Sequence, residues 1–134
     1  MPAAALPTDA VSEGLLRRGR HIAEALPYIR QYYGKTIVVK YGGAAMVDVD
    51  LRRSILEDVV LMHFVGMKPV LVHGGGPEIN AMLERLGKEA HFVGGLRVSD
   101  EETAEVAEMV LVGKINKALA GEITLRGGRA VGLS

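Results

Sequence analysis

The chain of 134 residues has no cysteine, so it can form neither a disulfide bond nor a thiolate metal site. Aromatic residues make up only 4% of the sequence, and no basic stripe is interleaved with them. The 16 basic and 16 acidic residues cancel, which argues against a nucleic-acid partner bound through bulk charge. No apolar run is long enough to span a membrane, and the N-terminus lacks the features of a secretory signal. These absences favour a cytoplasmic protein.

Hydrophobic residues make up 49% of the chain, which is enough for one domain with a buried core. Residues 1–11 are rich in alanine and proline and are predicted to be a disordered arm. Residues 12–34 are predicted to form a helix that Pro27 kinks and Gly34 ends. Its apolar or small residues recur every three or four positions, at Leu15, Gly19, Ile22, Leu26, Ile29 and Tyr33.

Strand and helix patterns alternate over residues 35–134. We predict strands at residues 36–40 and 68–73, each followed by a helix, and then a hairpin within residues 88–98. Ser99 and Glu102 have the spacing of a capping box that opens a third helix. A last strand is predicted at residues 130–133, with nothing after it, which suggests a cut chain. Such alternation is typical of an α/β fold with a mainly parallel sheet covered by helices.

Two glycine-rich loops follow the two strands. Gly42 and Gly43 follow the first strand, and Gly74, Gly75 and Gly76 follow the second. Glycine lets the backbone approach a ligand closely, and a helix N-terminus behind the loop favours an anion. Ligands of parallel sheets bind outside the carboxyl ends of the strands, where both loops should lie. The loops therefore predict a phosphate or carboxylate site, although tight turns without a ligand would have the same composition.

Two basic residues accompany these loops. Lys40 lies at the end of the first strand, where it would stabilise charge on a transferring phosphoryl group. The alternative is an ordinary solvated lysine. Arg97 follows Gly94 and Gly95 in the hairpin, and a guanidinium there would clamp a carboxylate through two hydrogen bonds. An exposed arginine without a ligand is the alternative.

Two nucleotide-binding patterns are incomplete. The tripeptide from Gly34 to Thr36 resembles the end of a Walker A loop, but the required earlier glycine is replaced by Ile29. The dinucleotide fingerprint Gly-x-Gly-x-x-Gly is absent after the first strand, and His73 stands where an acidic residue would hold ribose. The histidines show no metal-ligand spacing. The sequence therefore predicts no bound metal from its own residues.

Three motifs together resemble the N-terminal part of the N-acetylglutamate kinases, within the amino-acid kinase family. They are VVKYGG at residues 38–43, VHGGGPEI at residues 72–79 and GGLRV at residues 94–98. The first two recur in related kinases, whereas the third points to N-acetylglutamate. The resemblance implies a three-layer α/β/α sandwich and phosphorylation of the γ-carboxylate of N-acetyl-L-glutamate by ATP with Mg²⁺, a step of arginine biosynthesis.

The same resemblance implies roles for individual residues. Lys40 would stabilise the transferring phosphoryl group, and Arg97 would hold the substrate α-carboxylate. Gly75 and Gly76 would contact the substrate. Backbone donors to phosphate would come from the glycines Gly42, Gly43 and Gly74.

The N-terminal helix resembles that of the arginine-inhibited kinases, in EALPYI at residues 24–29 and YGK at residues 33–35. This implies arginine as feedback inhibitor, Tyr28 near its site, and a hexamer built as a trimer of dimers. The family's C-terminal part binds the nucleotide and has no counterpart here, so residues 35–134 would be a truncated substrate-binding part. A non-catalytic module that binds an amino acid and oligomerises is the alternative.

Overall fold

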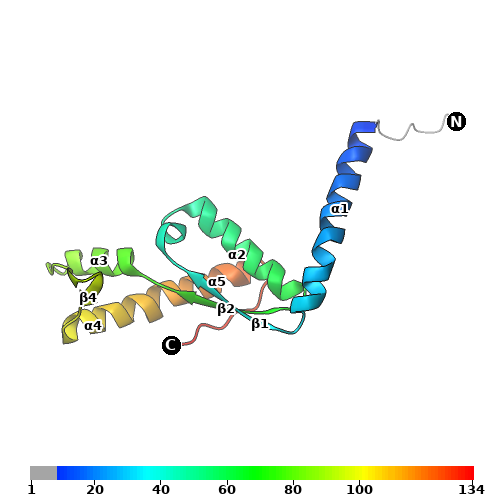
Figure 1. Ribbon diagram of the computed structural model, residues 1–134. Helices are drawn as coiled ribbons and strands as arrows, with labels where there is room; N and C mark the ends of the chain where they lie inside the picture. The colour runs from blue at the N-terminus through cyan, green and yellow to red at the C-terminus, as the bar shows by residue number, and fades with distance from the viewer. Residues whose placement is uncertain (1–8) are drawn as a thin grey trace.

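The computed structural model describes residues 9–134, with the side chains of residues 9–12 and 44 excepted (Figure 1). It is an α/β protein with a parallel sheet preceded by an N-terminal helix, as predicted. Along the chain the elements are α1 (Asp9–Tyr32), β1 (Thr36–Tyr41), the 3₁₀ helix η1 (Gly43–Met46), α2 (Val49–Phe64), β2 (Lys68–His73), α3 (Gly76–Arg85), β3 (His91–Val93), β4 (Leu96–Val98), α4 (Glu101–Glu108), the π-helix η2 (Met109–Asn116) and α5 (Lys117–Leu125).

The strands β1 and β2 are parallel, with Thr36 opposite Lys68 and Tyr41 opposite His73. Side chains alternate between the two faces of such a sheet. Residues of one face are buried or half-buried, whereas Val38, Val70 and Val72 of the other face are exposed. The described residues therefore form two layers of the expected three, with one face of the sheet open.

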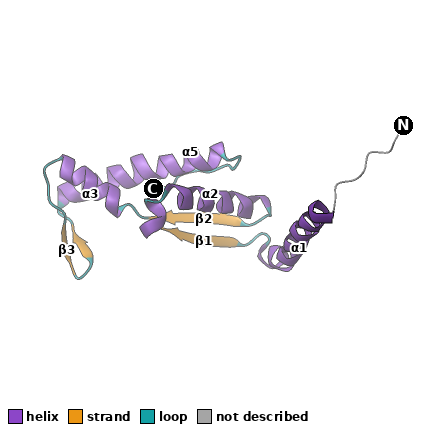
Figure 2. Cartoon of the chain, turned by 90° about the horizontal axis from the view of Figure 1, so that it is seen from above, coloured by secondary structure: helices purple, strands orange, loops and turns teal. Residues whose placement is uncertain are grey.

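The core lies between the sheet and the helices. β1, α2 and α3 each contribute one almost completely buried side chain, namely Tyr41, Leu56 and Leu83. The run from α4 through η2 to α5 packs against them (Figure 2). It supplies four further core residues, Val106, Val110, Ile115 and Leu119. Leu51, in the first turn of α2, is exposed.

The helix α1 projects away from the rest of the chain (Figures 1 and 2). It begins at Asp9, three residues before the predicted start, and continues through Pro27. Residues 1–8 of the predicted arm lie outside the described residues. Of the predicted apolar stripe, Leu15, Ile22 and Leu26 are exposed. Packing against its own domain therefore does not account for this part of the helix, because Leu15, Ile22 and Leu26 meet no core.

The junction of α1 with β1 packs on the junction of α2 with β2. The Gly34 N–H donates to the Gly66 carbonyl at 2.8 Å. Gly66 has a φ of +92°, and a Cβ there would lie 2.2 Å from the Tyr33 ring. Only glycine meets both requirements, since a side chain would strain the backbone and collide with the ring.

Gly66→Ala is expected to destabilise the chain by about 1–2 kcal/mol through its backbone conformation alone, with a further loss from displacing Tyr33. Gly87→Ala is the matched control, because Gly87 has a φ of +73° and no heavy atom near its absent Cβ. Urea unfolding followed by circular dichroism measures both. Equal destabilisation of the two variants would show that the Tyr33 contact contributes nothing.

The predicted capping box at the start of the third helix is wrong. The N-cap of α4 is Asp100, whose carboxylate accepts a hydrogen bond from the Thr103 N–H at 2.9 Å. The same carboxylate pairs with Lys88 at 2.7 Å, and Lys88 also pairs with Glu102 at 2.8 Å. The Asp100 carboxylate thus caps the helix and also pairs with a cation, whereas the uncharged Ser99 hydroxyl would not form the ion pair. Lys88 and Asp100 flank the hairpin β3–β4 and join its two ends.

This pairing makes stability depend on pH. The Lys88 ammonium and the Thr103 hydrogen bonds hold the pKa of Asp100 well below its usual range. A carboxyl group with a depressed folded pKa stabilises the fold above its unfolded pKa of about 3.9, and this stabilisation is lost as the pH falls below that value. Carboxyl groups titrate between about pH 5 and about pH 2, and the free energy of unfolding should fall over this range. We expect a smaller fall in Asp100→Asn than in the wild type, as measured by urea unfolding at each pH. Asparagine keeps the cap, so an identical pH dependence would exclude the pairing.

The predicted strand at residues 130–133 is not formed. Residues 128–134 have no regular structure, and Asn116 Nδ2 donates to the Leu133 carbonyl at 3.0 Å. A cavity separates this segment from β2. An extended segment becomes a strand only when its backbone pairs with a neighbour, and here the neighbouring strand is out of reach.

Candidate functional site

The two glycine loops meet at the carboxyl ends of β1 and β2, as predicted. The Gly74 N–H donates to the Tyr41 carbonyl at 3.0 Å, which fixes one loop against the end of the other strand. The Tyr41 hydroxyl donates to the Ala45 carbonyl at 2.8 Å and anchors η1. Burial raises the pKa of this phenol, so Tyr41 stays protonated and acts as a donor. The edge of the sheet thus has two glycine loops held in fixed positions.

The three glycines of the second loop have different surroundings. Gly75 is the N-cap of α3 and is buried, and a Cβ on it would lie 2.7 Å from side-chain atoms of both Leu111 and Ile115. Gly76 is the first residue of α3 and would meet no atom within 4 Å. N–H groups in the first turn of a helix have no partner within that helix. The loop therefore packs against η2 at Gly75 and presents bare backbone at Gly76.

Gly75→Ala is expected to destabilise the chain by about 1–3 kcal/mol, because the added methyl group overpacks a filled site. Its φ of −174° is accessible to alanine, so the cost is one of packing alone. Gly76→Ala is expected to leave stability unchanged or slightly higher, because alanine favours the helix and the space is open. Thermal unfolding of the two variants measures this, and a reversed order would refute the described packing.

Lys40 and the first loop lie at the open side of the sheet. Lys40 is exposed and stands opposite Val72 in register, on the face that no described helix covers. It forms no ion pair with a residue that the structure describes. No atom lies near the absent Cβ of Gly42 or Gly43, and Gly43 has a φ of +61°. A cation and open backbone therefore lie close together in sequence at this edge.

Arg97 reaches from β4 to the first turn of α3. Its Nη2 donates to Asn80 Oδ1 at 2.5 Å and to the Gly76 carbonyl at 3.4 Å. Its Cζ lies 4.8 Å from the centre of the Phe92 ring. Its Nη1 is buried and has no hydrogen-bond partner within residues 9–134. The structure thus brings Arg97 to Gly76, and it adds Asn80 and Phe92, which the sequence analysis did not identify.

The electrostatics at the start of α3 favour an anion. A helix N-terminus carries a positive partial charge, and Arg97 places a full positive charge beside it. In the described part of the chain, Arg97 has no carboxylate partner. Glu78, in the first turn of α3, is paired with Lys114 of η2. Positive potential at Gly76 is therefore left for a ligand to neutralise.

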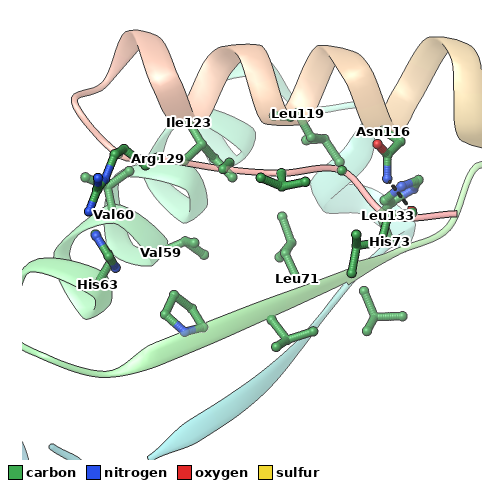
Figure 3. A pocket seen from close by; sticks show the side chains of 18 of the residues that line it. Val59, Val60, His63, Leu71, His73, Asn116, Leu119, Ile123, Arg129 and Leu133 are labelled. Carbon is green, nitrogen blue, oxygen red and sulfur yellow. Dashed lines mark hydrogen bonds between the residues drawn. The ribbon is translucent and has the colours of Figure 1, made fainter. Parts of the chain in front are cut away.

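A separate cavity has no lining residue in the glycine loops. It has a volume of about 720 Å³ and lies between β2, α2, α5 and residues 128–133 (Figure 3). Its wall is largely apolar, with Val59, Leu71 and Leu119 among the lining side chains (Figure 3). It is bounded by the unpaired C-terminal segment and lacks both Lys40 and Arg97. We therefore place the candidate site at the glycine loops.

Other predicted features are further from this site. Tyr28 is exposed on α1, outside the glycine-loop region. Among the residues that the structure describes, no three histidine, aspartate or glutamate side chains form a group able to hold a metal ion. Within residues 9–134, no helix is long and apolar enough to cross a membrane.

Residues 35–134 match the amino acid kinase family, and the chain belongs to that family. Among curated proteins it is similar to acetylglutamate kinases. It is 62% identical over 112 residues to the enzyme of Moorella thermoacetica and 64% identical over 113 residues to that of Pelotomaculum thermopropionicum. Each alignment covers 84% of this chain and 38% of the relative, so the chain spans about two fifths of the length of these relatives.

Solved structures share the fold at lower identity. The N-acetylglutamate synthase of Neisseria gonorrhoeae complexed with coenzyme A and N-acetyl-glutamate has a TM-score of 0.60 at 25% identity, covering 80% of this chain and 24% of that one. The same synthase complexed with coenzyme A and L-arginine has a TM-score of 0.52 at 28% identity, covering 86% and 26%. A protein of Streptococcus mutans UA159 has a TM-score of 0.61 at 27% identity, covering 69% and 37%.

Proposed function

We propose that this chain is the substrate-binding part of a cytoplasmic kinase that transfers the γ-phosphoryl group of ATP to the γ-carboxylate of N-acetyl-L-glutamate, in arginine biosynthesis. The observation that carries this is the convergence of Arg97 and the open glycine Gly76 at the start of α3. Family membership and the similarity to acetylglutamate kinases support the choice of reaction and substrate.

Arg97 would bind the α-carboxylate of the substrate. Its guanidinium has no carboxylate partner among the described residues, and the substrate would supply one. Pairing with a carboxylate would also neutralise the positive potential of the helix start. Gly75, predicted to contact the substrate, is buried against Leu111 and Ile115 and would shape the loop instead. Gly76 would let the substrate approach the backbone closely.

Lys40 would act at the other end of the substrate. In the proposed reaction, a γ-carboxylate oxygen attacks the terminal phosphorus of ATP, and the bond to the leaving ADP oxygen breaks. Negative charge spreads over the transferring group, and a lysine ammonium there stabilises it. Gly42 and Gly43 would donate backbone N–H groups to the phosphates, and both have open space where a side chain would be. The Gly74 N–H, predicted to do the same, already donates to the Tyr41 carbonyl and would only hold the loop in place.

ATP and Mg²⁺ would be held mainly by other parts of the enzyme. ATP supplies the phosphoryl group, and the glycine loops fit its terminal phosphates through backbone donors. Among the described residues, no three histidine, aspartate or glutamate side chains form a group that could hold Mg²⁺. We therefore assign no step to the metal through these residues.

The exposed helix α1 would join subunits into a hexamer built as a trimer of dimers, and arginine would inhibit the enzyme at a site near Tyr28. The support is the exposed apolar side of α1, with Leu15, Ile22 and Leu26 in solvent. A single chain gains nothing from exposing such residues, whereas a helix interface would bury them.

A phosphoryl-transfer assay with alternative acceptors tests the proposed function. The complete enzyme, supplied with ATP and Mg²⁺, is expected to phosphorylate N-acetyl-L-glutamate and to leave aspartate and carbamate unchanged. Preference for aspartate or carbamate would refute the substrate. Tight binding of N-acetyl-L-glutamate without turnover would favour the non-catalytic binding module instead.

A further inference from the structure

The Arg97 guanidinium is held from more than one side. Asn80 Oδ1 accepts from its Nη2 at 2.5 Å, and the Gly76 carbonyl lies at 3.4 Å from the same nitrogen. The Phe92 ring lies under its Cζ at 4.8 Å. The Asn80 contact is the shortest of these and comes from a helix, whereas Phe92 belongs to the same hairpin as Arg97. Asn80 therefore ties the hairpin side chain to α3.

One fixed nitrogen determines the direction of the other. The guanidinium is planar, so an Nη2 bonded to Asn80 and a Cζ over the Phe92 ring restrict rotation of the group. The remaining Nη1 is then aimed in one direction, and it is the nitrogen without a partner in residues 9–134. Without Asn80, the long side chain would sample several rotamers, and ordering it would oppose ligand binding.

We propose that Asn80 is a positioning residue, whose side-chain oxygen holds Nη2 of Arg97 and so fixes the guanidinium that would bind the substrate carboxylate. Asn80 itself would not touch the substrate. The Gly76 carbonyl is bonded within the first turn of α3 and is the more distant acceptor, so it would not replace Asn80. The identity of the ligand in this inference rests on the proposed function. The ordering of Arg97 by Asn80 is independent of that function.

The first measurement needs no ligand. Proton–nitrogen NMR of the 134-residue chain reports rotation of the Arg97 guanidinium through its Nη resonances. We expect separate, slowly exchanging Nη signals in the wild type and in Asn80→Asp, which keeps an acceptor. Asn80→Leu should average them, and Glu84→Leu, one turn further along α3, should not. Slow rotation in Asn80→Leu, or fast rotation in the wild type, would overturn the proposal.

The second measurement concerns substrate. In the complete enzyme, Asn80→Leu should raise the KM for N-acetyl-L-glutamate by about tenfold with little change in kcat, as for one lost hydrogen bond to a charged group. The double variant Asn80→Leu/Arg97→Ala should have the same KM as Arg97→Ala alone, because Asn80 acts through that arginine. Additive effects would contradict the positioning role. An Arg97→Ala variant with unchanged KM would instead refute the carboxylate clamp of the proposed function, while the NMR result would still decide whether Asn80 orders Arg97.

Discussion

Lys40→Ala is expected to lower kcat of the complete enzyme by about 10²–10³-fold, as the loss of other groups that stabilise transition-state charge does. The lysine stands at the end of β1, exposed on the open face of the sheet, and no described carboxylate neutralises it. Its charge is therefore available to a phosphoryl group. Steady-state kinetics with saturating ATP and N-acetyl-L-glutamate measure the effect.

Lys68→Ala is the matched control for this experiment. Lys68 is also an exposed strand lysine, but it stands at the amino end of β2, opposite Thr36. Its loss should leave kcat nearly unchanged, because the site lies at the other end of the strands. A near-normal kcat in Lys40→Ala would remove this lysine from the mechanism. Comparable losses in both variants would point to an effect on folding.

Arg97→Ala is expected to weaken substrate binding by about 2–5 kcal/mol, the usual cost of truncating one partner of a desolvated charge pair. The physical reason is that the Arg97 guanidinium, which has no carboxylate partner among the described residues, lies beside the positive end of α3. The loss should be seen mainly in KM for N-acetyl-L-glutamate and less in kcat, since the α-carboxylate does not react.

Two further variants sharpen that result. Arg97→Lys keeps the charge but lacks the planar fork, so it should recover only part of the affinity. Arg85→Ala removes an exposed arginine from the last turn of α3 and should have no effect on KM. An unchanged KM in Arg97→Ala, or full recovery in Arg97→Lys, would argue against a clamp with two hydrogen bonds.

The order of strands and helices could be predicted because its signals are local. β-branched runs ended by glycine became β1 and β2, and Gly66 and Gly87 ended the following helices with positive φ. Gly94 and Gly95, both with positive φ, formed the turn of the hairpin. Glycine is favoured wherever the backbone must take this conformation, so its position in sequence is informative.

Other features depend on contacts between distant residues and could not be predicted. The π-helical turn of η2 places Leu111 and Ile115 against Gly75, and helical periodicity gives no signal for it. The segment at residues 130–133 has the composition of a strand, but a strand also needs a paired neighbour. Asp100 rather than Ser99 is the cap, and its carboxylate also pairs with Lys88, twelve positions earlier in the chain.

The candidate site also contains residues that the sequence predicts and contacts that only the folded structure reveals. Motif spacing was enough to select Lys40, Gly76 and Arg97, and the structure brings Arg97 to Gly76. The contact of Arg97 with Asn80 joins residues 17 positions apart, on a hairpin and a helix. Only the folded arrangement reveals it, because nothing in an asparagine on an exposed helix face distinguishes it from a solvated one.

The most direct test of the site is a crystal structure of the complete enzyme with N-acetyl-L-glutamate and a non-hydrolysable ATP analogue. The account predicts the substrate α-carboxylate in hydrogen-bond contact with the Arg97 guanidinium, its chain against Gly76, and Lys40 beside the terminal phosphate. Substrate bound in the cavity between β2 and residues 128–133, with no carboxylate on Arg97, would contradict it.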